Sequence, residues 1–226
     1  MVKKNNSVHL EGVLEGFQFP VSKDGVFCAR ASVVTLHPRS GVDGVGKPSE
    51  VYEKLHHEVR IIGDEKNFAL LSSIHDDFLA CKNENGSLLP CRVDGFLLSN
   101  GEESFVVCQA KSFSRNDMIK TNGNNRVNIT GEVVSTSYTN ETAQIRFKTD
   151  EGVLDSFVSR RVSQDIWDMV ADGKLNKGDV VSMSGPLLSN VMSDGEKRIR
   201  TCMVSPQILQ KQKVNRLSSK KGSVTL

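Results

Sequence analysis

The chain has 226 residues, 38% of them hydrophobic and 25% charged, and a net charge of +2. This composition is typical of a folded globular protein and excludes a disordered or fibrous one. No segment has the about 20 consecutive apolar residues of a membrane helix, and the basic start lacks the apolar block of a secretory signal. We therefore expect a cytoplasmic protein and no membrane partner.

The first half predicts five strands and one helix. Alternation of apolar and polar residues indicates half-buried strands at residues 8–14, 26–36, 51–62, 89–98 and 104–113. A helix is expected around residues 66–79, and glycine and proline indicate a long loop at 37–50. Together these elements define a first domain over residues 1–114.

The second half predicts the same order of elements. Residues 115–125 are polar and aperiodic, as in a linker. Strands are then expected at residues 126–134, 143–148, 153–162, 178–188 and 197–209. Ser163 can cap a short helix that Gly173 ends. The second domain therefore covers residues 126–210, and a basic flexible tail follows at 211–226.

Three pairs of similar segments occur in the same order in the two halves. The pairs are VHLEG at 8–12 with VNITG at 127–131, GFLLSN at 95–100 with GPLLSN at 185–190, and GEESFVVC at 101–108 with GEKRIRTC at 195–202. Three collinear matches favour a duplicated unit over chance.

Five short strands with a helix between the third and fourth are typical of the OB-fold. We therefore predict an all-β protein of two tandem OB-fold five-stranded barrels, each with one short helix. The segment KLHHEVRIIG at 54–63 resembles the third strand of bacterial single-stranded DNA-binding proteins. KGDVVSMSGPL at 177–187 resembles their fourth strand, and residues 8–12 and 125–131 resemble the first. The resemblance implies single-stranded DNA as the ligand, bound on the outer face over strands two and three.

The chain departs from that family at several positions. His56 replaces the usual stacking tryptophan, and Ile62 replaces a phenylalanine. The second half has RRV at 160–162 without the closing glycine, and the family's acidic carboxyl-terminal segment has no counterpart. The resemblance is therefore to a divergent tandem-domain member.

Binding single strands requires flat side chains for base stacking and cations along the phosphate path. In the third strand, alternation places Leu55, His57, Val59 and Ile61 inward. The outward candidates of the first domain are Arg30, Tyr52, Lys54, His56 and Arg60. For the arginines, an ordinary solvated strand position is the alternative.

In the second domain, Leu154, Val158 and Val162 are predicted to face inward, which leaves Phe157 as an exposed aromatic residue. The outward candidates of this domain are Tyr138, Arg146, Lys148, Phe157 and Arg161.

The end of the chain concentrates positive charge. Residues 197–226 contain eight Lys or Arg and no acid, so the remainder carries 21 cations against 27 acids, or −6. Candidates for phosphate contacts here are Arg198, Arg200, Lys211 and Lys213. A solubilising terminus is the alternative.

No catalytic motif is present, so we expect no enzyme. The five cysteines are scattered and form no C-x-x-C pair, which indicates reduced, buried thiols. The spacing of His75, Cys81 and Cys91 matches no standard zinc site, and we expect neither a metal nor a cofactor.

The sequence therefore predicts sequence-tolerant binding of single-stranded DNA in replication, recombination or strand protection. The alternatives are an OB-fold protein-interaction module of a replication or transfer complex and an RNA-binding OB protein. Replication or recombination proteins are further candidate partners, and a homodimer would bring four barrels together. Binding to DNA would associate this cytoplasmic protein with the nucleoid.

Overall fold

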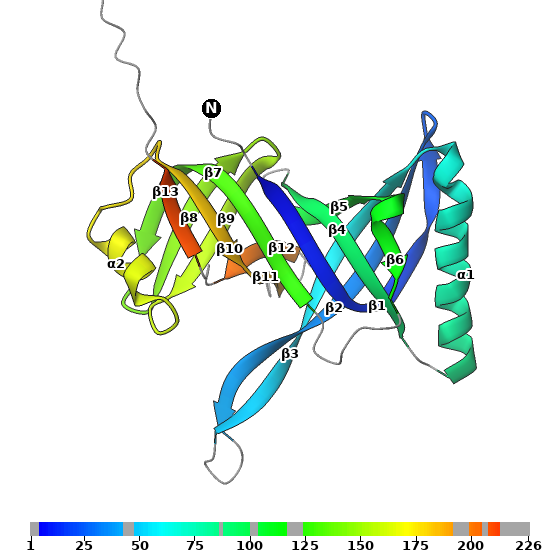
Figure 1. Ribbon diagram of the computed structural model, residues 1–226, viewed down its shortest axis with the longest axis horizontal. Helices are drawn as coiled ribbons and strands as arrows, with labels where there is room; N and C mark the ends of the chain where they lie inside the picture. Colours follow the sequence, from blue (N-terminus) through cyan, green and yellow to red (C-terminus); the bar gives the residue numbers. More distant parts are fainter. Residues whose placement is uncertain are drawn as a thin grey trace, which may run out of the picture.

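The computed structural model describes residues 5–42, 48–85, 88–99, 104–116, 124–191, 199–204 and 208–212. Strands dominate these ranges, and all of them are connected through one sheet (Figure 1). No helix in the described ranges has the length and apolar character needed to span a membrane.

The first half forms a ring of paired strands. Its strands are β1 (Asn6–Lys23), β2 (Val26–Val42), β3 (Pro48–Gly63), β4 (Leu89–Ser99) and β5 (Ser104–Gln109). The pairing order β1-β2-β3-β5-β4 returns to β1, and only β3 and β5 are parallel. Helix α1 (Phe68–Asn85) lies between β3 and β4 in sequence, and the short strand β6 (Phe113–Arg115) pairs with β4. This is the predicted OB-fold order.

The second half repeats this order. Its elements are β7 (Asn124–Tyr138), β8 (Thr142–Thr149), β9 (Gly152–Ser159), α2 (Gln164–Ala171), β10 (Val180–Gly185), β11 (Leu187–Val191), β12 (Ile199–Val204) and β13 (Ile208–Gln212). Strands β10 and β11 together take the place of β4, interrupted at Pro186, which has no backbone N–H to donate. Strand β12 pairs in parallel with β9, as β5 does with β3. The fold class is therefore confirmed as two OB-type units.

The two halves are joined through their first strands. Strand β1 pairs antiparallel with β7, and Val8 lies opposite Val127. Val8 also faces Gly95 of β4, while Val127 faces Gly185 of β10. The similar sequence segments therefore occupy equivalent register positions. As a result, β6-β4-β1-β7-β10-β13 form one antiparallel layer across both halves (Figure 1).

A pair of asparagines fixes the first strand of each half to its fourth. Asn6 donates from Nδ2 to the Leu97 carbonyl (2.8 Å) and accepts from the Leu97 N–H at Oδ1 (3.0 Å). Asn125 makes the same two contacts with Leu187, at 2.7 and 2.9 Å. The equivalence of these two asparagines was not predicted from the sequence, although each stands two residues before the first valine of the repeat.

The glycines at the end of the first repeat segment are required by close packing. A Cβ at Gly131 would lie 2.7 Å from the Phe147 ring and 2.8 Å from the Lys148 carbonyl oxygen. A Cβ at Gly12, the equivalent position, would overlap the Val34 carbonyl. The backbone of the neighbouring strand therefore excludes a side chain at both positions.

Two strand boundaries differ from the sequence prediction. Residues 15–23 continue β1, because shifts in register after Leu14 and Gln18 let the chain pass Gly16 and Pro20 without ending the pairing. The predicted loop at 37–50 is largely a hairpin arm instead, with His37 opposite Glu53 and Val42 opposite Pro48. Proline is tolerated there because each strand of a two-stranded arm has a free edge. The arm extends away from the barrel in Figure 1.

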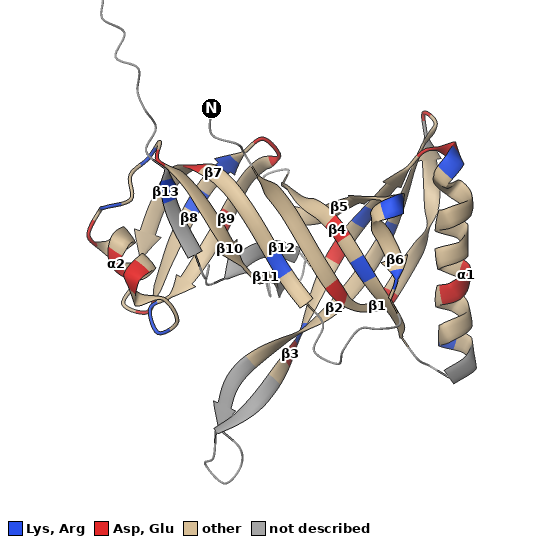
Figure 2. Cartoon of the chain, viewed as in Figure 1, with Lys and Arg blue, Asp and Glu red and all other residues tan. Residues whose placement is uncertain are grey.

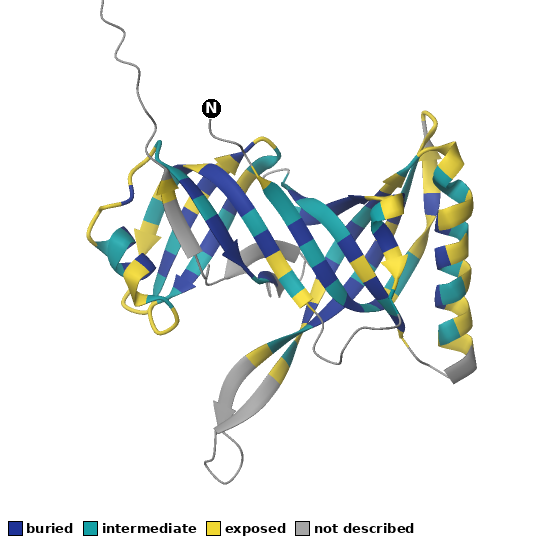
Figure 3. Ribbon diagram, in the orientation of Figure 1, coloured by how far each residue is buried: buried dark blue, intermediate teal, exposed yellow. Residues whose placement is uncertain are grey.

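The strand bounds at the ends of the two halves also differ by a few residues from the predicted domain limits. Asn124 and Asn125, assigned to the linker, are the first residues of β7, and Arg115 belongs to β6. Lys211, assigned to the tail, is part of β13. Figure 3 shows that the buried positions alternate along the strands and occupy one side of α1. The core is therefore enclosed by the strands of each half.

Candidate nucleic-acid interface

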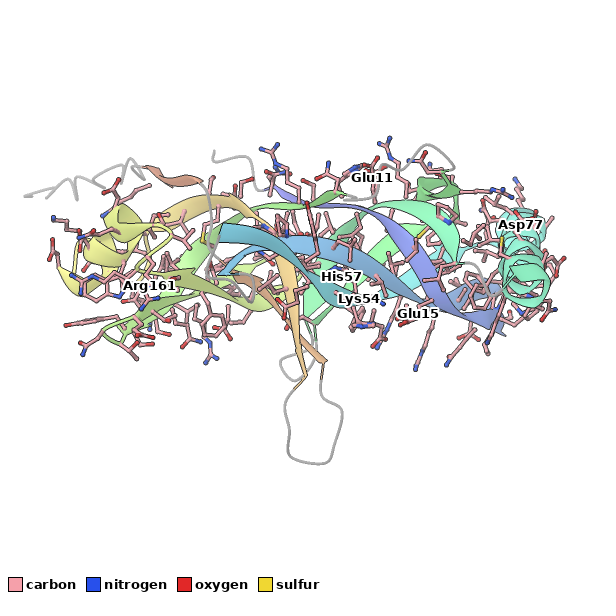
Figure 4. All side chains as sticks on the ribbon, turned by 90° about the horizontal axis from the view of Figure 1, so that it is seen from below. Glu11, Glu15, Lys54, His57, Asp77 and Arg161 are labelled. Carbon is pink, nitrogen blue, oxygen red and sulfur yellow. The ribbon has the colours of Figure 1, made fainter. Side chains whose placement is uncertain are left out.

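The predicted inward and outward sides of β3 are confirmed. Leu55, His57, Val59 and Ile61 are at most 4% exposed. The alternate residues point outward, and we call the outward side chains of β2 and β3 the β2–β3 face. It includes Arg30, Ser32, Tyr52, Lys54, His56, Glu58 and Arg60. Figure 4 shows Lys54 and Glu15 on one side of the molecule and Glu11 on the opposite side.

Cations on this face fall into two groups. Arg30 and Lys54 are exposed, and no other described residue pairs with them. Arg60 lies with its guanidinium carbon 3.4 Å from the centre of the Phe105 ring, and its Nε donates to Glu58 Oε1 at 3.3 Å. His56 Nδ1 lies 3.0 Å from Glu15 Oε2. Arg30 and Lys54 are therefore the cations most available to phosphate, whereas Arg60 is held flat on an aromatic ring.

A hollow lies between two rows of this face. Gln18, Arg30 and Arg60 stand opposite one another on β1, β2 and β3, and Ser32 and Glu58 stand opposite each other in the next row. In that second row β1 contributes Gly16, which has no side chain. The small residues leave a cavity of about 280 Å³. Its lining also includes Arg30 and His56.

His57 is buried beneath this hollow and belongs to a polar chain that reaches the second half. Its Nε2 is 2.8 Å from Thr35 Oγ1, and Asn125 Nδ2 donates to the same hydroxyl at 3.3 Å. Burial, with a smaller contribution from His56, lowers the pKa of His57 from 6.5 to about 3. His57 is therefore neutral at neutral pH and structural, as its inward position predicts.

The corresponding β8–β9 face of the second half is less cationic. Arg146 forms a bidentate pair with Asp155, with Nε to Oδ1 at 2.9 Å and Nη2 to Oδ2 at 3.0 Å, and this pairing raises the pKa of Arg146. Lys148 is exposed, with no partner among the described residues. Phe157, predicted to be exposed, is only half exposed, because β9 is an inner strand here, with Gln144 of β8 opposite Phe157 on one side and the backbone of β12 paired on the other.

The segment after β9 differs from the prediction. Val162 was predicted to face inward but is 70% exposed, because the chain turns after Ser159 and leaves the strand. Arg161 is exposed in this turn. The neighbouring Arg160, which the sequence did not single out, lies 4.2 Å from the centre of the Trp167 ring.

Tyr138 stands at the end of β7, against Trp167. It is 55% exposed, and its ring meets Trp167 edge-on at 5.6 Å. Trp167 is buried and donates from Nε1 to the Thr139 carbonyl at 3.0 Å. Tyr138 therefore offers an exposed ring at the edge of the second half, apart from the first-half hollow.

The carboxyl-terminal candidates are placed only in part. Arg198 and Lys213 lie outside the described residues, and Arg200 is described only by its backbone in β12. Lys211 pairs with Asp179 at 2.9 Å and donates to the Lys174 carbonyl at 3.0 Å. It is therefore anchored in the fold and is not part of a free tail.

Charges of both signs also lie on the opposite, six-stranded layer (Figure 2). His9 Nδ1 lies 2.6 Å from Asp94 Oδ1, and Arg92 Nε donates to Asp94 Oδ2 at 2.8 Å. Partial burial raises the pKa of Asp94, but the hydrogen bonds from His9 and Arg92 outweigh it and lower the pKa. These side chains are satisfied by one another.

The described residues contain no group of three or more metal-binding side chains. Cys91 and Cys108 are free thiols inside the first half, and burial raises the pKa of both to about 12. A thiol with such a pKa is a poor nucleophile at neutral pH.

No protein-family model matches the chain, and no curated protein matches it. Two crystal structures of the single-stranded DNA-binding protein from Thermus aquaticus are similar to it. The wild-type structure matches with a TM-score of 0.63 and 18% identity, over 94% of this chain and 95% of that one. A deletion mutant matches with a TM-score of 0.61 and 18% identity, over 97% of this chain and 100% of that one. Along almost its whole length, the chain therefore has an OB fold like that of a single-stranded DNA-binding protein.

Proposed function

We propose that this protein binds single-stranded DNA without strong overall sequence preference, as a non-enzymatic component of replication, recombination or strand protection. The observation that carries the proposal is the β2–β3 face, where exposed cations without described partners stand beside flat side chains. The similarity of fold to the Thermus aquaticus protein supports the same proposal.

The β2–β3 face supplies both contacts that single strands need. Arg30 and Lys54 can neutralise phosphates. Arg60 is packed on Phe105, and the exposed 27% of its side chain can contact a base, as arginine does in cation–π stacking. Tyr52 continues the face toward the hairpin arm and provides a further ring. An arginine platform thus substitutes for the tryptophan that the family usually has.

The second half is proposed to extend the same path with weaker contacts. Lys148 and Arg161 are exposed cations. The ring of Phe157 is partly exposed, and that of Tyr138 is exposed. Because Asp155 already neutralises Arg146, this half should contribute less to phosphate binding than the first.

Fluorescence polarisation with labelled oligo-dT, oligo-rU and duplex DNA across a salt series tests the proposal. About five phosphate contacts on single strands would give a log–log slope of affinity against salt near about −3.5. Tighter binding to oligo-dT than to the duplex supports the proposal. No binding at low salt would refute it and favour a protein-interaction module, and preference for oligo-rU would indicate an RNA-binding protein.

A pair of matched variants locates the binding face. Arg30→Ala with Lys54→Ala should weaken oligo-dT binding and flatten the salt slope by about 1.4, which is about 0.7 for each lost phosphate contact on a single strand. Lys82→Ala with Lys177→Ala removes the same charge from exposed positions outside β2 and β3 and should change the slope much less. Equal effects of the two double variants would show that net charge, not this face, governs binding.

We also propose that two chains associate through the six-stranded layer, which would bring four barrels together. The layer spans both halves and has charges of opposite sign near its centre, with Glu11 on β1 and Arg126 on β7. A two-fold arrangement would place such charges in complementary positions. Light scattering should give twice the chain mass, and a monomeric mass would reject this assembly.

A further inference from the structure

The hollow on the β2–β3 face contains a hydrogen-bond acceptor, the carboxylate of Glu58, beside the cation Arg30, which favours phosphate. Its position follows from the strand register, in which Gly16 and Ser32 leave space between the row of Arg30 and the position of His56. Rows on one face of a strand repeat about every 6.6 Å. The cavity of about 280 Å³ is near the lower end of ligand pockets, a size suited to one planar ring system.

Glu58 forms the chemically distinct part of this lining. It stands on β3 opposite Ser32 and lines the cavity together with Arg30 and Gln18. Its contact with Arg60 uses one acceptor site of Oε1 at a long 3.3 Å, which leaves Oε2 and the remaining acceptor site of Oε1 for a ligand. A carboxylate repels a phosphate, so this position does not serve the phosphate path. It can instead accept hydrogen bonds from N–H groups of a base.

We propose that the hollow holds one nucleobase and that Glu58 makes it select guanine. This inference rests on the proposed binding of single-stranded DNA. Guanine presents two adjacent donors, N1–H and N2–H, to a carboxylate, and its O6 and N7 are acceptors that arginine recognises. Thymine and uracil place a single N3–H between two carbonyl oxygens, which a carboxylate repels. Guanine alone among the bases therefore offers Glu58 two adjacent donors together with acceptors for Arg30.

Selection of guanine at one position is compatible with binding of strands of any sequence. Most bases in a bound strand would stack without discrimination, whereas the one base over the Gly16 and Ser32 row would be read. The protein would then bind any strand and set its register on a strand that contains guanine.

The test uses the full-length protein and short oligo-dT probes that carry a single central dG, dC, dA or deoxyinosine. A well-formed bidentate contact is worth about 1–3 kcal/mol, so the dG probe should bind at least about fivefold more tightly than plain oligo-dT. Deoxyinosine keeps N1–H but lacks the N2 amino group, and it should lose most of this gain.

Variants separate the role of Glu58 from a general effect of charge. Glu58→Gln should remove the preference for dG, so that this variant binds the dG probe and plain oligo-dT with equal affinity. Glu15→Gln removes the neighbouring carboxylate, which pairs with His56, and should keep the preference. Ser32→Val, which fills the hollow from β2 with a residue suited to strands, should also abolish the preference.

Equal affinity for all probes, or a dG preference that survives Glu58→Gln, would overturn the inference while the proposed function stands. Absence of binding to every probe would instead reject the proposed function.

Discussion

Acid should destabilise this protein through His57, because the buried imidazole resists protonation. The folded-state pKa of His57 is about 3, below the unfolded value of 6.5. As the pH falls below about 6.5, the unfolded chain takes up a proton that the folded protein refuses, so the free energy of unfolding decreases. The loss continues until the pH reaches the folded pKa. Stability that is present at pH 7.5 is therefore progressively lost between about pH 6.5 and pH 3.

The size of the effect at moderate pH depends mainly on the unfolded pKa. At pH 5.0 the unfolded histidine lies about 1.5 pH units below its pKa, which corresponds to about 2 kcal/mol. This decrease in the free energy of unfolding at pH 5.0 is nearly the same for any folded pKa of His57 below about 4. Urea unfolding at pH 7.5 and 5.0 measures it, and a His57→Gln variant isolates it, because the other four of the five histidines remain.

The His57→Gln variant should show a decrease between the two pH values that is about 2 kcal/mol smaller than that of the parent protein. His56→Gln, one residue away and exposed, should behave like the parent. If the His57→Gln and parent proteins lose the same free energy between pH 7.5 and 5.0, the assignment of a buried neutral His57 is refuted.

Three further changes test other parts of the molecule. Asn125→Ala leaves the buried N–H and C=O of Leu187 without partners and should cost about 2–4 kcal/mol in urea unfolding; a loss under about 1 kcal/mol would show that the contact is dispensable. Asp155→Asn frees Arg146, so oligo-dT affinity should rise by roughly fivefold for about 1 kcal/mol of added attraction, and unchanged polarisation curves would exclude Arg146 from the path. Removing residues 213–226, which carry four Lys or Arg, should flatten the salt slope of oligo-dT binding, and an unaltered slope would show that this segment does not contact phosphate.

Strand alternation and the internal repeat predicted most of the fold. The pattern around His57 oriented residues 55–61 of the third strand correctly, because a two-residue period has only two possible orientations and the apolar set selects one. The same reasoning failed at Val162, where the strand had already ended in a turn. It also missed the second part of β1, since Gly16 and Pro20 are normally read as breaks and the shifts in register that accommodate them leave no periodic signal.

The candidate site could be predicted only in part. The exposed positions of Arg30 and Lys54 followed from alternation. The pairing of Arg146 with Asp155 did not, because it depends on which residues of two neighbouring strands stand opposite each other. The hollow above Gly16 was missed for the same reason: its two rows come from three strands whose register the sequence does not specify.

The pairing of β1 with β7 has a consequence for how the chain is made. The first half contains all the strands of its own ring, yet the edge of β1 from Asn6 to Glu11 has no neighbour until Asn124 and the residues after it have been synthesised. An open strand edge can pair with the same edge of another nascent chain. Carrying both halves in one polypeptide supplies the correct partner at high local concentration. The pairing of β1 with β7 is then a late folding step within one chain and does not require two molecules to meet.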